Sequence, residues 1–171
     1  MIDLCEQLCL PGHVCFMGIG NVHHGDDGFG VRLAEQLDQA GVPDVLVAGT
    51  TPEHCIGTVT DHGYDHLVFL DAVEFGGSAG SAVFLDSTEI TGKFPQISTH
   101  KMSLGTLAKL AEAGGKTQVW LLGVQPEALK GGDKLSPAVQ KTMELLAGLL
   151  SKRRPVKPEP AKAHCRKRAA A

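Results

Sequence analysis

Apolar and polar residues come in blocks that predict strands followed by helices. The first block is an apolar run over 14–17, and a glycine-rich stretch over 18–30 follows it. After that stretch, apolar residues recur at helical spacing from Val31 to Leu37. This order predicts a buried strand over 13–19, a glycine-rich turn and an amphipathic helix over 27–40.

The same alternation continues to about residue 150. Further strands are predicted over 44–48, 66–73, 81–85 and 118–124. Further helices are predicted over 52–63, 104–111 and 135–150. The link before 81–85 is short, which favours antiparallel pairing for that strand. Together these elements predict an α/β fold with a twisted, mostly parallel sheet of about five strands and helices on both faces.

Composition predicts one globular domain over 1–150 and a tail over 151–171. The chain has 171 residues, 43% hydrophobic and 20% charged, as in ordinary globular proteins. A net charge of -3 gives no overall basic field for nucleic acid. No apolar run approaches the length of a membrane span, and residues 1–12 do not resemble a signal peptide. We therefore expect a cytoplasmic protein without nucleic-acid or membrane partners.

The tail is basic, contains several prolines and is nearly free of apolar residues, which predicts disorder. Its charge suits either a solvated extension or a contact with nucleic acid or acidic partners. The five cysteines cannot all pair within one chain, and free thiols are the expectation for a reducing compartment. Cys5 and Cys9 could share one helix face as part of a zinc site, whereas Cys15 fits a small core residue.

The glycine-rich turn carries two adjacent carboxylates, Asp26 and Asp27, at or just before the helix start. Unpaired backbone N–H groups and the helix dipole favour charged carboxylates at that position. A dinucleotide loop would need a third glycine where this chain has His23, and the aspartates would repel a pyrophosphate. The turn therefore favours a cation or metal over a nucleotide.

Two more residues are candidates for the same site. Asp71 comes at the carboxyl end of a predicted buried strand, close to the edge at which the first turn is expected. By itself Asp71 could cap the next turn, and Asp27 could simply cap the helix. His100 lies in a polar loop and by itself fits a surface histidine. Together they are carboxylate and imidazole donors suited to a divalent metal.

Several segments resemble the nickel–iron hydrogenase maturation endopeptidases. They are Gly18-Ile-Gly-Asn21, Asp26-Asp27-Gly28, Gly49-Thr-Thr-Pro-Glu53, Leu70-Asp71-Ala72, Ser98-Thr99-His100 and Leu122-Gly-Val-Gln-Pro-Glu127. The similarity spans about 14–150, in the same order along the chain. It implies a three-layer α/β/α domain.

The resemblance also implies an activity. Asp27, Asp71 and His100 would be the catalytic, nickel-binding trio of an aspartic-type endopeptidase. Such enzymes remove a C-terminal peptide from the hydrogenase large-subunit precursor after nickel insertion, so the nickel would be carried by the precursor. On this hypothesis the trio holds that nickel, and a carboxylate or a metal-bound water assists attack on the peptide bond.

Other functions stay open at this point. A nickel-checking chaperone that binds the precursor without cutting it would use the same three ligands. A related peptidase with another substrate, such as a spore germination protease, is a further alternative. No Ser-His-Asp order or H-E-x-x-H motif supports a standard serine or zinc protease. His23 stands where relatives usually have an apolar residue, so it is either a fourth ligand or only a substitution that faces solvent or packs against the sheet.

Overall fold

One five-stranded sheet, in the order β2-β1-β3-β5-β4, forms the centre of the protein. The computed structural model describes residues 4–94, 102–129 and 131–152. The strands are β1 (Val14–Ile19), β2 (Val45–Gly49), β3 (His66–Ala72), β4 (Ala82–Asp86) and β5 (Gln118–Val124). Of the strands described, β1, β2, β3 and β5 are parallel, and β4 runs antiparallel to β5. The predicted mostly parallel sheet is confirmed.

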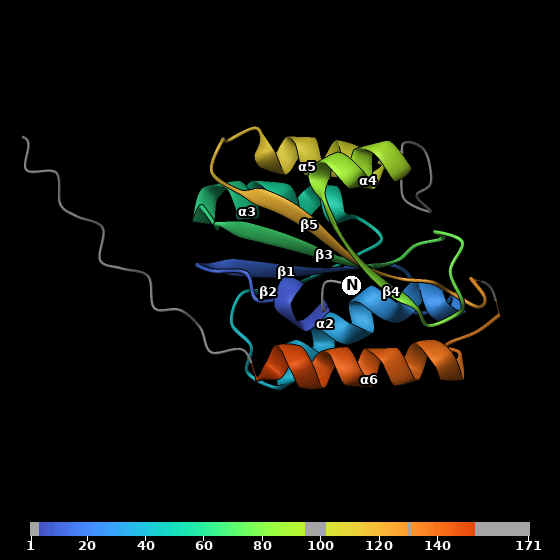
Figure 1. Ribbon diagram of the computed structural model, residues 1–171. Helices are drawn as coiled ribbons and strands as arrows, with labels where there is room; N and C mark the ends of the chain where they lie inside the picture. The colour runs from blue at the N-terminus through green and yellow to red at the C-terminus, as the bar shows by residue number, and fades with distance from the viewer. Residues whose placement is uncertain (1–3, 95–101, 130, 153–171) are drawn as a thin grey trace, which may run out of the picture.

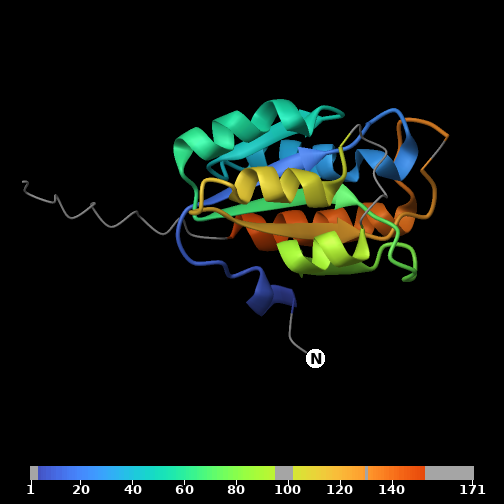
Figure 2. The same cartoon turned by 90° about the horizontal axis from the view of Figure 1, so that it is seen from above.

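Helices cover both faces of the sheet, giving three α/β/α layers (Figures 1 and 2). On one face lie α2 (Phe29–Gln39) and α6 (Pro137–Ser151), with one hydrophobic cluster between them and the strands. On the other face lie α3 (Ile56–His62), α4 (Ser87–Lys93) and α5 (Leu104–Glu112), over a second cluster. The short elements are α1 (Leu4–Gln7) and the 3-10 turns η1 (Gly25–Gly28) and η2 (Pro52–Cys55).

The sequence pattern did not reveal α4 or the sheet neighbour of β4. Helix α4 is only 7 residues long, but it has a capping box at its start. The Asp86 carboxylate accepts the Glu89 N–H at 2.8 Å, and the Glu89 carboxylate accepts the Asp86 N–H at 3.2 Å. Strand β4 is antiparallel, as predicted, but it pairs with β5 at the sheet edge instead of with β3.

Helix α2 packs against the strands with glycines at the contact. A Cβ atom at Gly30 would overlap the carbonyl oxygens of Leu70 and Ile19. A Cβ atom at Gly18 would lie 2.5 Å from the Cβ of Ala34. The backbone of α2 is thereby seated directly against the carboxyl ends of β1 and β3, and η1 is held over the same edge.

The cysteine predictions have separate outcomes. Cys15 is fully buried in β1, and burial, with Asp44 and Cys55 nearby, raises the pKa of its thiol to about 12. It is a core residue, as predicted. Cys9 is exposed and Cys55 is half-buried, both as free thiols. The Cys5 side chain, Cys165 and the predicted tail beyond Lys152 lie outside the described residues.

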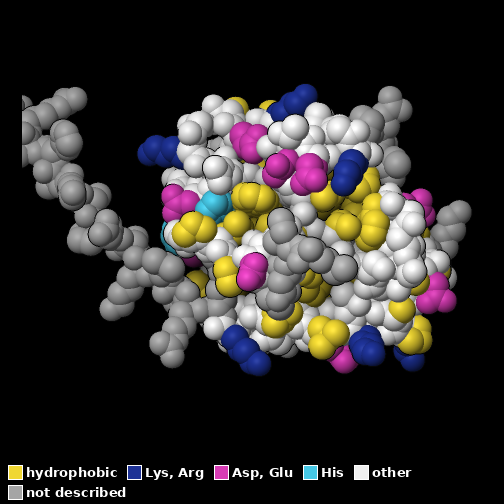
Figure 3. Space-filling model, in the orientation of Figure 1, with side chains coloured by type: hydrophobic (Ala, Val, Ile, Leu, Met, Phe, Trp, Pro, Cys, Tyr) yellow, Lys and Arg dark blue, Asp and Glu magenta, His cyan; other side chains and the backbone are white. Residues whose placement is uncertain are grey.

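Hydrophobic side chains on the face shown in Figure 3 lie across its middle, over the β4–β5 edge, with charged groups around them. Helix α1 contacts β4 there, and Phe84 stacks on Trp120 with ring centroids 5.2 Å apart. Within the described ranges, none of the helices has the length and apolar character needed to span a bilayer.

A pair of glycine substitutions tests the close seating of α2. We expect Gly30→Ala to destabilise the protein by about 3 kcal/mol or more, because rigid backbone oxygens cannot yield to the methyl group. Gly148→Ala, in α6, is the matched control, since a Cβ there meets nothing within 4 Å. It should stabilise the protein by roughly 0.5–1 kcal/mol through helix propensity. Urea unfolding measures both, and equal effects would contradict the account.

Candidate functional site

Asp27 and Asp71 meet at the carboxyl edge of the sheet, where the strand order reverses. From β1 the chain passes through α2 to β2 on one side, and from β2 it passes through α3 to β3 on the other side of β1. Ligands of open α/β sheets bind in the crevice that forms at such a reversal. Asp27 lies in η1, just after β1, and Asp71 is the second-last residue of β3. The structure therefore brings these two predicted site residues together.

The turn before α2 holds the Asp27 carboxylate in a fixed orientation. Gly20 has a φ of +129°, and a Cβ atom there would collide with the Asp27 carbonyl oxygen. The Asn21 N–H donates to Asp27 Oδ2 at 2.9 Å, and the Asn21 side-chain oxygen accepts the His23 N–H at 3.0 Å. The chain thus folds back over Asp27, which only a glycine at position 20 allows.

Asp71 is buried, with 4% of its surface exposed, and accepts the Ala72 N–H at 2.8 Å. Desolvation and the nearby charge of Asp27 raise its pKa well above the ordinary value, against the opposing effect of the Ala72 hydrogen bond. Two carboxylates in such a pair cannot both ionise without cost. A shared proton or a bound cation would relieve both the desolvation and the repulsion.

Asp26, the neighbour of Asp27, has a different role. Its buried carboxylate accepts four hydrogen bonds from the segment between β5 and α6. The donors are the N–H groups of Glu127, Ala128 and Ser136 and the Ser136 hydroxyl, at 2.8, 3.1, 2.6 and 2.9 Å. These donors are 101–110 residues away along the chain, so no local pattern could identify this role. Of the two carboxylates expected at the helix start, Asp26 therefore anchors a loop and Asp27 faces the site.

His23 is exposed over 74% of its side chain, and its Nδ1 lies 3.0 Å from the Asp133 carboxylate. This position agrees with the solvent-facing interpretation of the substitution. Glu53, in η2 after β2, is a residue that the sequence analysis gave no role. Its Oε2 atom is buried and has no hydrogen-bond partner among the residues described.

His100, the third predicted site residue, lies outside the described residues. Helix α5, which follows it, begins at the end of the molecule where β1, β3 and β5 end (Figures 1 and 2). Over 4–94, 102–129 and 131–152, no three His, Cys, Asp or Glu side chains are arranged to hold a metal ion. The pair Asp27 and Asp71 supplies hard oxygen donors that fit a divalent cation, and an imidazole would complete a set suited to nickel.

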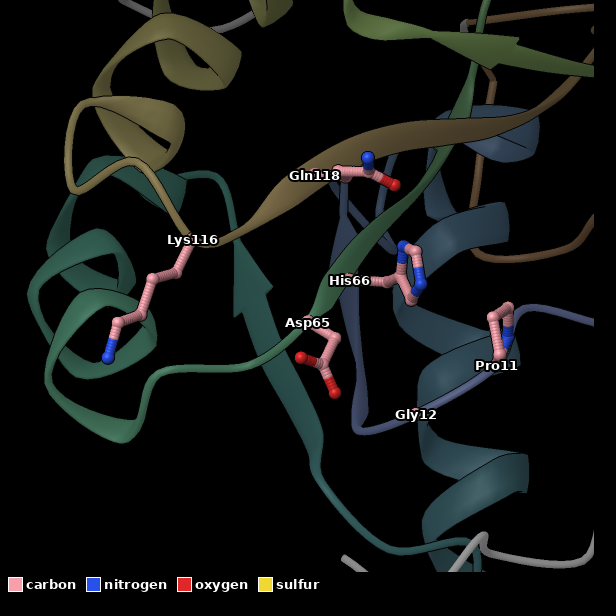
Figure 4. A pocket seen from close by; sticks show the side chains of 6 residues that line it. All are labelled: Pro11, Gly12, Asp65, His66, Lys116 and Gln118. Carbon is pink, nitrogen blue, oxygen red and sulfur yellow. The ribbon is translucent and has the colours of Figure 1, made fainter. Parts of the chain in front are cut away.

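A hollow of about 360 Å³ lies at the opposite edge of the sheet (Figure 4). It is bordered by Pro11, Gly12, Asp65, His66, Lys116 and Gln118, near the amino ends of β1, β3 and β5. His66 is buried and its Nδ1 accepts the Trp120 Nε1–H at 3.1 Å, while Lys116 extends away from it. These side chains do not converge on one point, unlike the two aspartates at the other edge.

Comparison with known proteins identifies the family. A family model described as hydrogenase maturation protease matches residues 31–152, a range that includes Asp71 and His100 but begins after Asp27. The hydrogenase 2 maturation protease of Escherichia coli is 30% identical over 139 residues, which cover 77% of this chain and 84% of that protein. The HoxM hydrogenase expression/formation protein of Cupriavidus necator is 34% identical over 151 residues, covering 80% and 73%.

Solved structures agree with the sequence comparison. The crystal structure of the NiFe hydrogenase maturation protease HycI from Thermococcus kodakarensis superimposes with a TM-score of 0.76 and 30% identity. That match covers 87% of this chain and 96% of the other. The maturating endopeptidase HybD from Escherichia coli gives 0.68 at 26% identity, covering 82% and 88%.

The raised pKa of Asp71 predicts how its replacement affects stability. The folded protein binds a proton at Asp71 more strongly than the unfolded chain does, so ionisation of Asp71 costs stability as pH rises above the ordinary carboxyl range. Asp71→Asn removes that cost and retains an acceptor for the Ala72 N–H. We expect the variant to have a larger free energy of unfolding at neutral pH, with the difference shrinking as pH falls toward about 4. Urea unfolding over that pH range measures it, and a variant less stable at pH 7 would contradict the prediction.

Proposed function

The chain belongs to the hydrogenase maturation protease family, and from this premise we propose that it is an endopeptidase acting on the large-subunit precursor of a nickel–iron hydrogenase. It removes the C-terminal extension after nickel has been inserted. The nickel is part of the substrate and serves as the recognition element. Asp27, Asp71 and His100 contact it when the precursor docks.

The observation that carries the proposal is the buried pair of carboxylates at the carboxyl edge of β1 and β3. Burial, and with it the nearby charge of Asp27, raises the pKa of Asp71. A divalent cation brought by the precursor would relieve the repulsion between the two carboxylates. Docking is therefore more favourable for a precursor that carries its metal than for an empty one, since the empty one leaves the repulsion in place.

Peptide hydrolysis also needs a group that accepts a proton from the attacking water. Asp71 is a carboxylate at the carboxyl end of β3, and carboxylates act as general bases in enzymes. In the proposed reaction Asp71 accepts a proton as the water oxygen bonds to the scissile carbonyl carbon. The proton then passes to the leaving amine as the carbon–nitrogen bond breaks. Asp27 is held by the Asn21 N–H and fixes the substrate beside Asp71.

The direct test is incubation of the protein with nickel-loaded and nickel-free precursor, followed by mass spectrometry of the large subunit. We expect a loss of mass at the C-terminus of the nickel-loaded form only. The variants Asp27→Asn, Asp71→Asn and His100→Ala should each slow cleavage by at least about 100-fold. His62→Ala is the matched histidine control, because His62 is exposed at the end of α3 and hydrogen-bonds to the Thr58 carbonyl. It should cleave at the wild-type rate.

Three results would contradict parts of the proposal. Equal cleavage of nickel-free precursor would remove the metal as recognition element. Binding of nickel-loaded precursor without any loss of mass would identify a non-cleaving nickel-sensing chaperone instead of a peptidase. Undiminished cleavage by His100→Ala would remove that histidine from the site.

A further inference from the structure

We propose that Asp26 and Gln125 are positioning residues that fix the two site carboxylates relative to each other through the segment between β5 and α6. Neither residue is assigned to contact the substrate. Asp26 anchors this segment to the loop that carries Asp27, and Gln125 anchors it to the loop that follows Asp71. The catalytic consequence rests on the proposed function, whereas the structural linkage can be measured without it.

The anchor on the Asp27 side combines side-chain and backbone hydrogen bonds. Besides the four bonds to the Asp26 carboxylate, the Asp26 N–H donates to the Ala128 carbonyl at 3.0 Å. The Gly25 N–H donates to the Gly132 carbonyl at 2.6 Å. Since Asp27 follows Asp26 directly in η1, a displacement of this turn would carry Asp27 with it.

The anchor on the Asp71 side depends on one amide side chain. Gln125 Oε1 accepts the N–H groups of Phe75 and Gly77, at 2.9 and 3.2 Å. The backbone of Gln125 also exchanges hydrogen bonds with the β3–β4 link, donating to the Ser81 carbonyl at 2.8 Å and accepting the Gly80 N–H at 2.9 Å. The chain that leaves Asp71 is therefore held by the residue that directly follows β5.

Residues on one segment thus contact both loops. Gln125 holds the loop that follows β3, and the Glu127, Ala128 and Ser136 N–H groups hold the turn that carries Asp27. These hydrogen bonds keep the two carboxylates at a set spacing for the substrate. A displacement of about 1 Å at a catalytic group can cost on the order of 100-fold in rate.

Kinetics of matched variants test the proposal. Gln125→Met keeps the side-chain volume but removes the acceptor for Phe75 and Gly77. We expect its kcat on nickel-loaded precursor to fall about 10- to 100-fold, with KM within about twofold of wild type. Gln125→Glu retains an oxygen acceptor and should restore most of kcat. Asp26→Asn should lower kcat similarly, and Ser136→Ala, which removes one of the four donors, should lower it less.

Thr117→Val controls for a general loss of stability. Thr117 is buried and its hydroxyl donates to the Tyr64 carbonyl at 2.8 Å, at the opposite edge of the sheet. This variant loses one buried hydrogen bond without changing the segment between β5 and α6, so its melting temperature should fall while kcat stays unchanged. If Gln125→Met and Asp26→Asn lower only the melting temperature and leave kcat at wild type, the positioning role is wrong.

Amide hydrogen exchange supplies a readout that needs neither precursor nor nickel. The Asn21 N–H donates to Asp27 and the Ala72 N–H donates to Asp71, so the two amides report the positions of the two carboxylates. We expect Asn21 to exchange faster in Asp26→Asn and Ala72 to exchange faster in Gln125→Met, with no change in Thr117→Val. Unchanged exchange in both variants would overturn the proposal. If the wild-type protein fails to cleave precursor, the proposed function is wrong, and the exchange rates still decide the linkage.

Discussion

The repulsion between two buried carboxylates is the constraint on which the rest of this site depends. Asp71 is held in the low-dielectric end of β3 with Asp27 close enough to raise its pKa. A fold gains no stability from such a pair, since burial and like charge both oppose ionisation. Such a pair is suited to binding a positive ion or to transferring a proton. The surrounding contacts hold the two carboxylates together.

Two kinds of contact hold Asp27 and Asp71 together. Glycines at positions 18 and 30 let α2 lie directly on β1 and β3, which seats η1 and Asp27 over the end of the sheet. Hydrogen bonds from the β5–α6 segment then fix the loops on either side. Close packing sets where the carboxylates lie, and hydrogen bonding limits how far they move. A metal held by a substrate arrives with its own ligands. Both the close packing and the hydrogen bonding would therefore be needed to bind it.

Much of the fold could be predicted because its signals are local. The apolar runs of β1, β3 and β5, the glycine-rich turn and the alternation of strand and helix are all visible in short windows of sequence. The position of Asp71 followed from the same logic, since the carboxyl ends of parallel strands share one edge. The resemblance to a known family added residue roles that local patterns left open.

The missed features depend on distant parts of the chain. The different roles of Asp26 and Asp27 arise from partners more than 100 residues away, which no spacing rule encodes. Strand β4 needed knowledge of the whole sheet order, because β5 inserts between it and β3. Helix α4 was an exception, since its capping box from Asp86 to Glu89 is a local signal that could have been used.

The central claim is that Asp27, Asp71 and His100 close on one nickel ion presented at the carboxyl edge of the sheet. Its most direct test is a crystal structure of the protein soaked with nickel, with the ion located by its anomalous scattering. The account predicts a single ion at this edge, with ligand atoms from all three residues at roughly 2 Å. A structure in which His100 remains too far away to share an ion with Asp27 and Asp71, or in which the nickel binds elsewhere, would contradict it.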